Sequence, residues 1–318
     1  MVARNWNIRL EPNNPGQVFA CMGILGVADV LGDARACFKW NGSNQYACFS
    51  IEAEADASEI VSLVKNAEVR LPQDSQVLWE KAEKSTGGRE APAEDVEEPG
   101  FRRAELLSMN TDVASREESG RAGDKDKGRR KSAREVSATF PVLLVIRDRE
   151  FLIDPWIHPE RRTLNNGLKL WAGQGNSEGY ITKYQEALPA SVADANGLFF
   201  IKNQLKDETR PSGYDPRSAI DSQSLGFSYN DLDFSPVIYP IVDMLANIGL
   251  ASARPRVTSE GYSTFEYYLW KEPFRVELAR MVLTGGASWL ASFKMVFRIR
   301  KRGNYKYFGF ADLVKQFK

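Results

Sequence analysis

The chain has 318 residues, and its 43% hydrophobic and 26% charged residues are typical of a globular protein with a substantial core. Its 42 basic and 42 acidic residues give a net charge of zero, whereas a free-standing nucleic-acid-binding protein usually carries a basic excess. Any nucleic-acid binding must therefore depend on local patches. His158 is the only histidine, which excludes metal sites built from several histidines and leaves one candidate for a histidine base.

The cysteines and the lack of a long apolar segment indicate the cellular compartment. Cys21, Cys37 and Cys48 are odd in number and form no CxxC pair, which is typical of buried thiols in a reducing compartment. We expect no signal peptide, and the sequence contains no apolar run long enough to span a bilayer. We therefore expect a cytoplasmic protein that has no membrane among its partners.

The chain opens with a strand and a buried helix. Residues 5–10 alternate polar and apolar side chains, which predicts a strand. Asn14 can cap the helix that follows and Pro15 fits its first position, and the helix is predicted to continue to Leu31 and to stop at Gly32. Because this helix is apolar around nearly its whole circumference, it must be buried within the chain or against a partner.

A charged segment divides the chain. A second strand is predicted at 45–52 and a short amphipathic helix at 57–67. Residues 84–135 hold few large apolar side chains and many charged ones, so they cannot bury enough surface to offset their ordering entropy. We expect an N-terminal α/β segment at 1–83, a disordered charged insertion at 84–135, and an α+β main segment at 136–318 that packs with 1–83.

The main segment is predicted to mix strands and helices before it becomes rich in strands. Its first part should begin with a strand hairpin at 141–154 and a helical stretch interrupted by glycines at 163–188. A short strand at 198–202, a long polar loop at 206–234 and an apolar helix started by Pro236 at 235–249 should follow. Four strands follow at 265–270, 274–282, 293–301 and 305–310. The predicted fold class is α+β, with mixed antiparallel sheets, two mostly apolar helices started by proline, and a strand-rich C-terminal region.

The last hairpin is the first candidate for a binding surface. The odd positions of 293–299 are apolar, and the positions between them are largely basic. Cations contact phosphates, and aromatic rings stack on unpaired bases. The alternative is a solvated outer sheet face, because Lys and Arg also protect edge strands. The cations and rings gathered here are Lys294, Arg298, Arg300, Lys301, Arg302, Lys306, Tyr305 and Tyr307.

A glycine turn near residue 173 is a second candidate. Lys169, Gln174 and Asn176 surround Gly173 and Gly175, and glycines allow a backbone to approach a phosphate closely. The turn follows no clear strand and contains no G-K-[ST], so it matches neither the dinucleotide fingerprint nor the P-loop. A plain turn between two helices is the competing interpretation.

Acidic residues in the long loop are a candidate for a metal site. Clustered carboxylates can hold Mg²⁺ for phosphodiester chemistry. Asp is also a common loop residue, and the spacing matches no known metal motif, which favours an ordinary loop. The residues concerned are Asp207, Glu208, Asp215, Asp221, Asp231 and Asp233.

Several short stretches are weak evidence for a protein family when taken singly, but their order along the chain is informative. NPGQVFACMGILGVADVL at 14–31 is followed by LKLWAGQ at 168–174, YDPRSA at 214–219, GFSYNDL at 226–232, PIVDMLANIGL at 240–250 and RPR at 254–256. Together these stretches resemble a CRISPR type I effector family, the large-subunit-like proteins of the type I-U (Dpsyc-like) systems. The first stretch is the most specific, and the set spans most of the chain outside 84–135.

The resemblance implies a non-catalytic subunit of a crRNA-guided, Cascade-type surveillance complex. Such a large subunit sits at the 5′ end of the crRNA, contacts the short motif beside the target in duplex DNA, and offers a surface to the helicase-nuclease. The implied partners are crRNA, target DNA, the other effector subunits and the recruited helicase-nuclease, and no cofactor is implied. Because no helical bundle is predicted at the C-terminus, the small subunit should be a separate chain.

No residue that contacts the flanking motif can be transferred from the family by its motifs. Asn and Gln can pair with adenine edges, and Arg with guanine. The nucleic-acid-binding candidates are therefore Lys169, Gln174, Asn176, Arg217, Asn230, Lys294, Arg298, Arg300, Arg302 and Lys306. Three alternatives stay open: a crRNA-binding backbone subunit built on a ferredoxin-like core, a metal-dependent nuclease that uses the acidic loop, and a scaffold without nucleic-acid contact.

Overall fold

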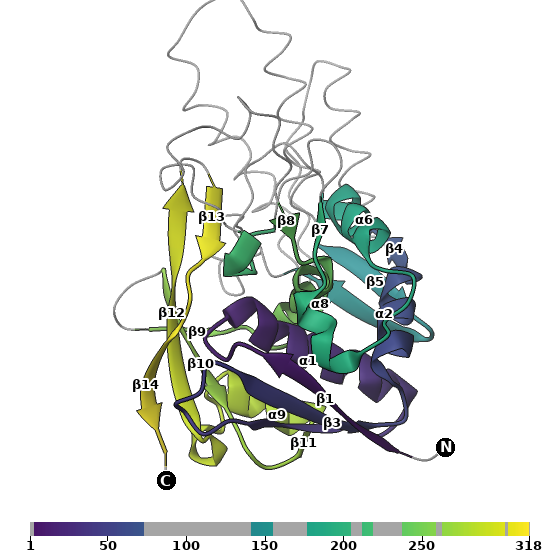
Figure 1. The fold of residues 1–318 in the computed structure, drawn as a ribbon. Coiled ribbons are helices and arrows are strands. Elements are labelled where there is room, and N and C mark those ends of the chain that lie inside the picture. The colour runs from purple at the N-terminus through teal and green to yellow at the C-terminus, as the bar shows by residue number, and fades with distance from the viewer. Residues whose placement is uncertain are drawn as a thin grey trace, which may run out of the picture.

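The computed structural model describes residues 3–72, 141–154, 177–204, 212–218, 237–258, 263–302 and 305–317. The predicted insertion at 84–135, His158 and the glycine turn near residue 173 lie outside these ranges. Within them the chain has the predicted α+β fold, with antiparallel sheets and a strand-rich C-terminal part (Figure 1).

A four-stranded sheet forms the N-terminal part. Its order is β1-β3-β2-β11, with the strands Arg4–Leu10, Ala47–Ala53, Arg35–Lys39 and Phe274–Arg275. The alternation in β1 buries Ile8 and Leu10, in agreement with the predicted strand. Helix α1 (Pro15–Leu31) connects β1 to β2, and β3 lies between these two strands. This is a split βαβ arrangement, the kind found in ferredoxin-like cores.

Two nearly apolar helices cross at the centre of the molecule. Both α1 and α8 (Pro240–Ser252) carry proline at their first position, although only the proline of α1, Pro15, is the one predicted. A Cβ on Gly23 would lie 2.1 Å from the carbonyl oxygen of Leu245, and a Cβ on Gly249 would lie 1.9 Å from that of Phe19. These two glycines therefore allow the helix backbones to touch. Figure 1 places the pair between the C-terminal sheet and the middle of the chain.

The middle of the chain forms a small sheet and two helices around α8. Helix α2 (Ala57–Lys65) and strand β4 (Glu68–Arg70) precede the hairpin of β5 (Val142–Ile146) and β6 (Arg149–Ile153), and β4 pairs with β5. Helix α6 (Ser177–Ala187) lies in the second half of the predicted helical stretch at 163–188. The predicted helix at 57–67 and the predicted hairpin are both confirmed.

Three predictions of secondary structure between residues 198 and 282 were wrong. The second apolar helix starts at Pro240, not at Pro236, because β8 (Val237–Ile238) pairs with β7 (Asn203–Gln204). Residues 198–202 contain no strand, and the 3-10 helix η1 (Ala195–Phe200) ends there instead. Only the first two residues of 274–282 are in a strand, because α9 (Val276–Leu283) buries Val276, Ala279 and Val282 at helical spacing.

The C-terminal part is a sheet built around one long strand, β12 (Phe293–Arg302). The order is β13-β12-β10-β9, and the unpredicted strand β14 (Asp312–Gln316) also pairs with β12. The other strands are β13 (Tyr305–Phe308), β10 (Thr264–Leu269) and β9 (Arg256–Val257). Two short 3-10 helices, η2 (Pro216–Ser218) and η4 (Ser288–Leu290), complete the described elements.

The inner face of this sheet packs on α1. The ring of Phe19 lies 5.9 Å from that of Tyr267, 6.4 Å from that of Phe297 and 6.5 Å from that of Phe308, measured between ring centroids. Phe297 and Phe308 are themselves 4.8 Å apart. The N-terminal helix therefore supports the strands that carry the candidate binding surface.

The structure also shows the state of the cysteines and whether a described helix could span a membrane. Cys21 and Cys37 are buried, whereas Cys48 is only half-buried, and all three are free. No helix in the described ranges is long and apolar enough to cross a membrane.

Candidate nucleic-acid interface

The hairpin of β12 and β13 has the two-faced character that the sequence predicts. Phe293, Met295 and Phe297 are buried, while Arg298 and Arg300 are exposed. Strand β12 is the long yellow arrow in Figure 1, and β13 pairs with its C-terminal half. The exposed basic residues therefore lie on the C-terminal half of the strand.

The strand register brings aromatic and basic positions together on the hairpin. Arg300 is opposite Tyr307, and Arg302 is opposite Tyr305. Residues that are directly opposite in an antiparallel pair project from the same face, about 4.5–5.5 Å apart at Cβ. The N–H of Gly309 extends the ladder by donating to the carbonyl of Arg298 at 2.8 Å. Arg300 and Tyr307 therefore place one charge beside one ring, a pairing that suits contact with an unpaired strand.

Lys294 lies on the same side of β12 as Arg298 and Arg300, but its ammonium group is paired with an acidic residue. Its Nζ lies 2.7 Å from Oε2 of Glu266 on β10, and only 27% of its side chain is exposed. The hydrogen bond to Glu266 raises the pKa of Lys294, with the charge of Glu266 acting in the same direction and burial opposing it. The ion pair with Glu266 therefore makes Lys294 less available to a phosphate.

Arg217 is largely buried, with only 13% of its side chain exposed. Its Nη2 donates to the carboxylate of Asp215 at 2.5 Å and to the carbonyl of Phe199 at 2.8 Å. Its guanidinium carbon lies 3.7 Å from the ring centroid of Tyr239. Burial alone would lower the pKa of Arg217, but hydrogen bonding to Asp215 raises it overall. The guanidinium is therefore committed to internal partners, and the structure does not bring it together with the hairpin cations.

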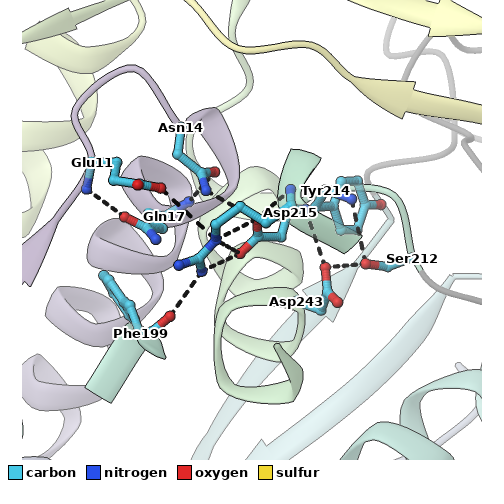
Figure 2. A network of polar contacts seen from close by, with 9 residues as sticks. Glu11, Asn14, Gln17, Phe199, Ser212, Tyr214, Asp215 and Asp243 are labelled. Carbon is cyan, nitrogen blue, oxygen red and sulfur yellow. Dashed lines mark hydrogen bonds and ion pairs between the residues drawn. The ribbon is translucent and has the colours of Figure 1, made fainter. Parts of the chain in front are cut away.

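The Asn14-Pro15-Gly16-Gln17 stretch meets this ion pair. Asn14 Oδ1 accepts from the N–H of Gln17 at 3.2 Å and so caps α1, while its Nδ2 donates to Asp215 Oδ1 at 3.0 Å. A Cβ on Gly16 would lie 2.4 Å from the carbonyl oxygen of Tyr214. The residue types at 14–17 and 214–217 thus have a structural explanation, since each stretch holds the other in place (Figure 2).

Asp243 is a buried acidic residue. In the sequence it is the only charged residue of the apolar helix α8, and we did not predict a role for it. The hydroxyl of Ser212 donates to its Oδ1, and the N–H of Asp215 lies 3.4 Å from the same atom. Burial, followed by the charge of Asp215, raises the pKa of Asp243 to about 8. An isolated acid on an otherwise apolar helix is the signal that would have marked this position.

The acidic loop is described only at Asp215. That side chain is fully buried and accepts hydrogen bonds from Asn14 and Arg217, which leaves it no open side for a metal. Within the described ranges, no group of three or more acidic, cysteine or histidine side chains is placed to hold a metal ion. The remaining residues of the cluster lie outside those ranges: Asp207, Glu208, Asp221, Asp231 and Asp233.

The other candidates divide into two groups. Lys169, Gln174, Asn176 and Asn230 lie outside the residues that the structure describes. On the hairpin, Lys306 is half-exposed and opposite Lys301, while Arg302 is placed only by its backbone. Of the ten candidates, the structure therefore gathers the hairpin residues on one strand pair and separates Arg217 from them.

Comparison with protein-family models, with curated proteins and with solved structures found no match to this chain.

Proposed function

We propose that this chain is a non-catalytic, large-subunit-like component of a type I CRISPR surveillance complex that binds target DNA near the flanking motif or the 5′ end of the crRNA. The stretches at 14–31, 214–219 and 240–250 support it through their resemblance to the large-subunit-like family. The observation that carries the proposal is the exposed pair Arg298 and Arg300, with Tyr307 opposite Arg300 on the adjacent strand.

The chemistry of this surface suits a phosphodiester strand. A guanidinium can hold a phosphate through two parallel hydrogen bonds, and a neighbouring tyrosine can stack on a base. Because the chain as a whole has no net charge, long-range attraction for nucleic acid is weak and the contact must be local. Partners in the complex would supply the remaining affinity: the crRNA, the other effector subunits, a separate small subunit and the helicase-nuclease.

Replacing Arg298 and Arg300 together with alanine should weaken target-DNA binding and flatten its salt dependence. Each lost phosphate contact reduces the slope of log K against log salt by about 0.9 for duplex DNA and about 0.7 for a single strand. Titrations at several salt concentrations measure both effects. The matched control replaces Arg35 and Arg275, two exposed arginines that pair with Asp33 on the N-terminal sheet.

Each part of the proposal can fail separately. An unchanged affinity and slope in the hairpin variant would remove the hairpin from the site. If the chain, alone or assembled, binds no polynucleotide at low ionic strength, the whole proposal is overturned. Cleavage of labelled DNA or RNA with Mg²⁺ or Mn²⁺, lost in Asp221→Ala, would instead support a metal-dependent nuclease.

A second candidate is a crRNA-binding backbone subunit of the same complex. The split βαβ arrangement of β1, α1, β2 and β3 favours it, because ferredoxin-like cores are built on this unit. Strand β4 departs from that core, since it pairs with β5 and not with β1. Native mass spectrometry of the assembled complex separates the two roles: one copy per guide supports the large-subunit role, and several copies support the backbone role.

A further inference from the structure

A second basic and aromatic surface lies at one end of the N-terminal sheet, where residues 40–46 connect β2 to β3. A cavity of about 380 Å³ opens there between this loop and Lys271, which follows β10. Its described lining includes two lysines, two asparagines and the rings of Trp40 and Tyr46, and no acidic side chain. The size falls within the range of small-molecule sites, which are about 300–1,000 Å³.

The loop that lines this cavity is held in one shape by its own hydrogen bonds. Asn41 Oδ1 accepts from the N–H of Ser43 at 3.0 Å and from that of Asn44 at 3.1 Å. Trp40 Nε1 donates to the carbonyl of Asn44 at 2.8 Å, and its ring lies 4.7 Å from that of Phe293. Gly42 takes a φ of 87°, which favours glycine. The Trp40 ring is therefore fixed before any ligand arrives.

Tyr46 is the exposed ring of the site, and Arg9 supports it. The guanidinium carbon of Arg9 lies 4.8 Å from the ring centroid of Tyr46 and 4.6 Å from that of Phe200. Tyr46 nevertheless stays 39% exposed and contributes to the cavity. An aromatic ring that is supported on one side and open to a cavity on another is a ready platform for a flat ligand.

Lys39 and Lys271 line the cavity, and Arg9 lies over the ring of Tyr46 beside it. Arg9 and Lys39 lie on either side of Cys48 in the strand register, so their side chains share the outer face of the sheet. Lys271, which follows β10, lies 5.1 Å from the ring centroid of Phe293. Within the described part of the chain, none of these three cations forms an ion pair, although Glu272 adjoins Lys271 in sequence.

We propose that this cavity binds one unpaired nucleotide of a single-stranded nucleic acid. The base would lie against Tyr46, the phosphate between Lys39 and Lys271, and the amides of Asn41 and Asn44 would be available to the base edge. Cations alone would equally suit an acidic peptide, but two oriented rings beside amides match a base and not a carboxylate. RNA and DNA share this chemistry. The inference rests on the proposed nucleic-acid-binding function and adds a contact on a different sheet from the hairpin.

Photocrosslinking of the full-length chain tests this directly. Single-stranded oligonucleotides containing 5-iodouracil, one RNA and one DNA, are irradiated with the protein at low ionic strength, and the crosslinked peptide is identified by mass spectrometry. We expect crosslinks within 40–46. Tyr46→Ala should lower oligonucleotide affinity about fivefold or more, the smaller end of the loss seen when a stacking ring is removed. Lys39→Ala should flatten the salt dependence, whereas Arg35→Ala, at the other end of the same strand, should not.

The outcomes distinguish this inference from the proposed function. Crosslinks at 40–46 that persist in the Arg298→Ala, Arg300→Ala double variant would support an independent site. Oligonucleotide binding that depends on the hairpin, with crosslinks elsewhere and wild-type affinity in both Tyr46→Ala and Lys39→Ala, would overturn the inference and leave the proposed function standing. Failure to bind either oligonucleotide would overturn both. The RNA and DNA arms then show which strand the cavity prefers.

Discussion

Arg217 lies with its guanidinium between Asp215 and the ring of Tyr239, and only 13% of its side chain is exposed. Arg217→Ala would leave Asp215 buried without its cation, so the free energy of unfolding should fall by about 3–5 kcal/mol. Arg217→Lys keeps the charge but loses the two parallel hydrogen bonds, so it should recover only part of the loss. Urea unfolding measures both.

The control for this prediction is Arg35→Ala, which removes an exposed arginine and should change stability by about 1 kcal/mol or less. A fully stable Arg217→Ala protein that had lost DNA binding would contradict the structural role. That result would instead support a direct contact between Arg217 and nucleic acid.

Asp243 gives the protein a pH-dependent stability. Its pKa is raised to about 8 in the folded chain, whereas an unfolded Asp has a pKa of about 3.9. Between these values the folded state holds a proton that the unfolded state has released. The contribution of Asp243 to stability therefore falls as the pH rises from about 4 to about 8, and levels off above the folded pKa.

Asp243→Asn isolates this effect. An amide oxygen can still accept from Ser212 and from the N–H of Asp215, but it does not titrate. Measured by urea unfolding at a series of pH values, wild type should lose stability relative to the variant as the pH rises. Parallel pH profiles for the two proteins would show that Asp243 titrates normally. Asp56→Asn, at an exposed helix cap, is the matched control.

At the scale of elements, the crossing of α1 and α8 depends on two glycines. Gly23→Ala and Gly249→Ala would each place a Cβ against a carbonyl oxygen of the opposite helix, so each should cost about 1–3 kcal/mol or more. Gly26→Ala is the control on the same helix, because its nearest neighbour is 3.7 Å away. That change should be neutral or stabilise by up to about 1 kcal/mol, since alanine favours helix. Thermal unfolding compares the three, and equal midpoints would contradict the close crossing.

The elements that were predicted well from the sequence are those whose apolar residues repeat with one clear period, either that of a helix or that of a strand. Pro15 and Gly32 bound a helix that is apolar all round, and the alternation at 293–299 fits only a strand. The segment 274–282 was mistaken because its short apolar pattern fits both periods, and packing of Val276 and Ala279 selects the helix. The four apolar residues at 198–201 were too few to distinguish a strand from a 3-10 turn.

At the scale of the whole molecule, three of the stretches of sequence that suggested a function are brought together by the fold. Asn14, Asp215 and Asp243 come from three of those stretches and meet in one buried network, although Asn14 and Asp215 are 201 positions apart. Spacing along a chain carries no information about such a contact. The hairpin surface was predictable because its partners are neighbours in sequence, whereas the internal role of Arg217 and the cavity at 40–46 depend on distant segments.

The same long-range packing makes a prediction about folding. Residues 1–72 contain α1, whose buried faces are covered by α8 and by the aromatic residues of the C-terminal sheet. Expressed alone, this fragment should lack a cooperative unfolding transition, because it would expose the apolar surface of that helix. Circular dichroism during heating measures this, with the full chain as reference. A sharp transition in the fragment would mean that it forms an independent domain.

The helix crossing also restricts how the protein can evolve. At Gly23 and Gly249 the opposing atoms belong to the main chain, so no substitution in the facing helix can create room for a larger residue. Second-site suppressors of Gly249→Ala should therefore be rare in a genetic selection, whereas losses in the side-chain core can be repaired by neighbours. Divergent homologues that keep this crossing should retain both glycines after their surface charges have drifted.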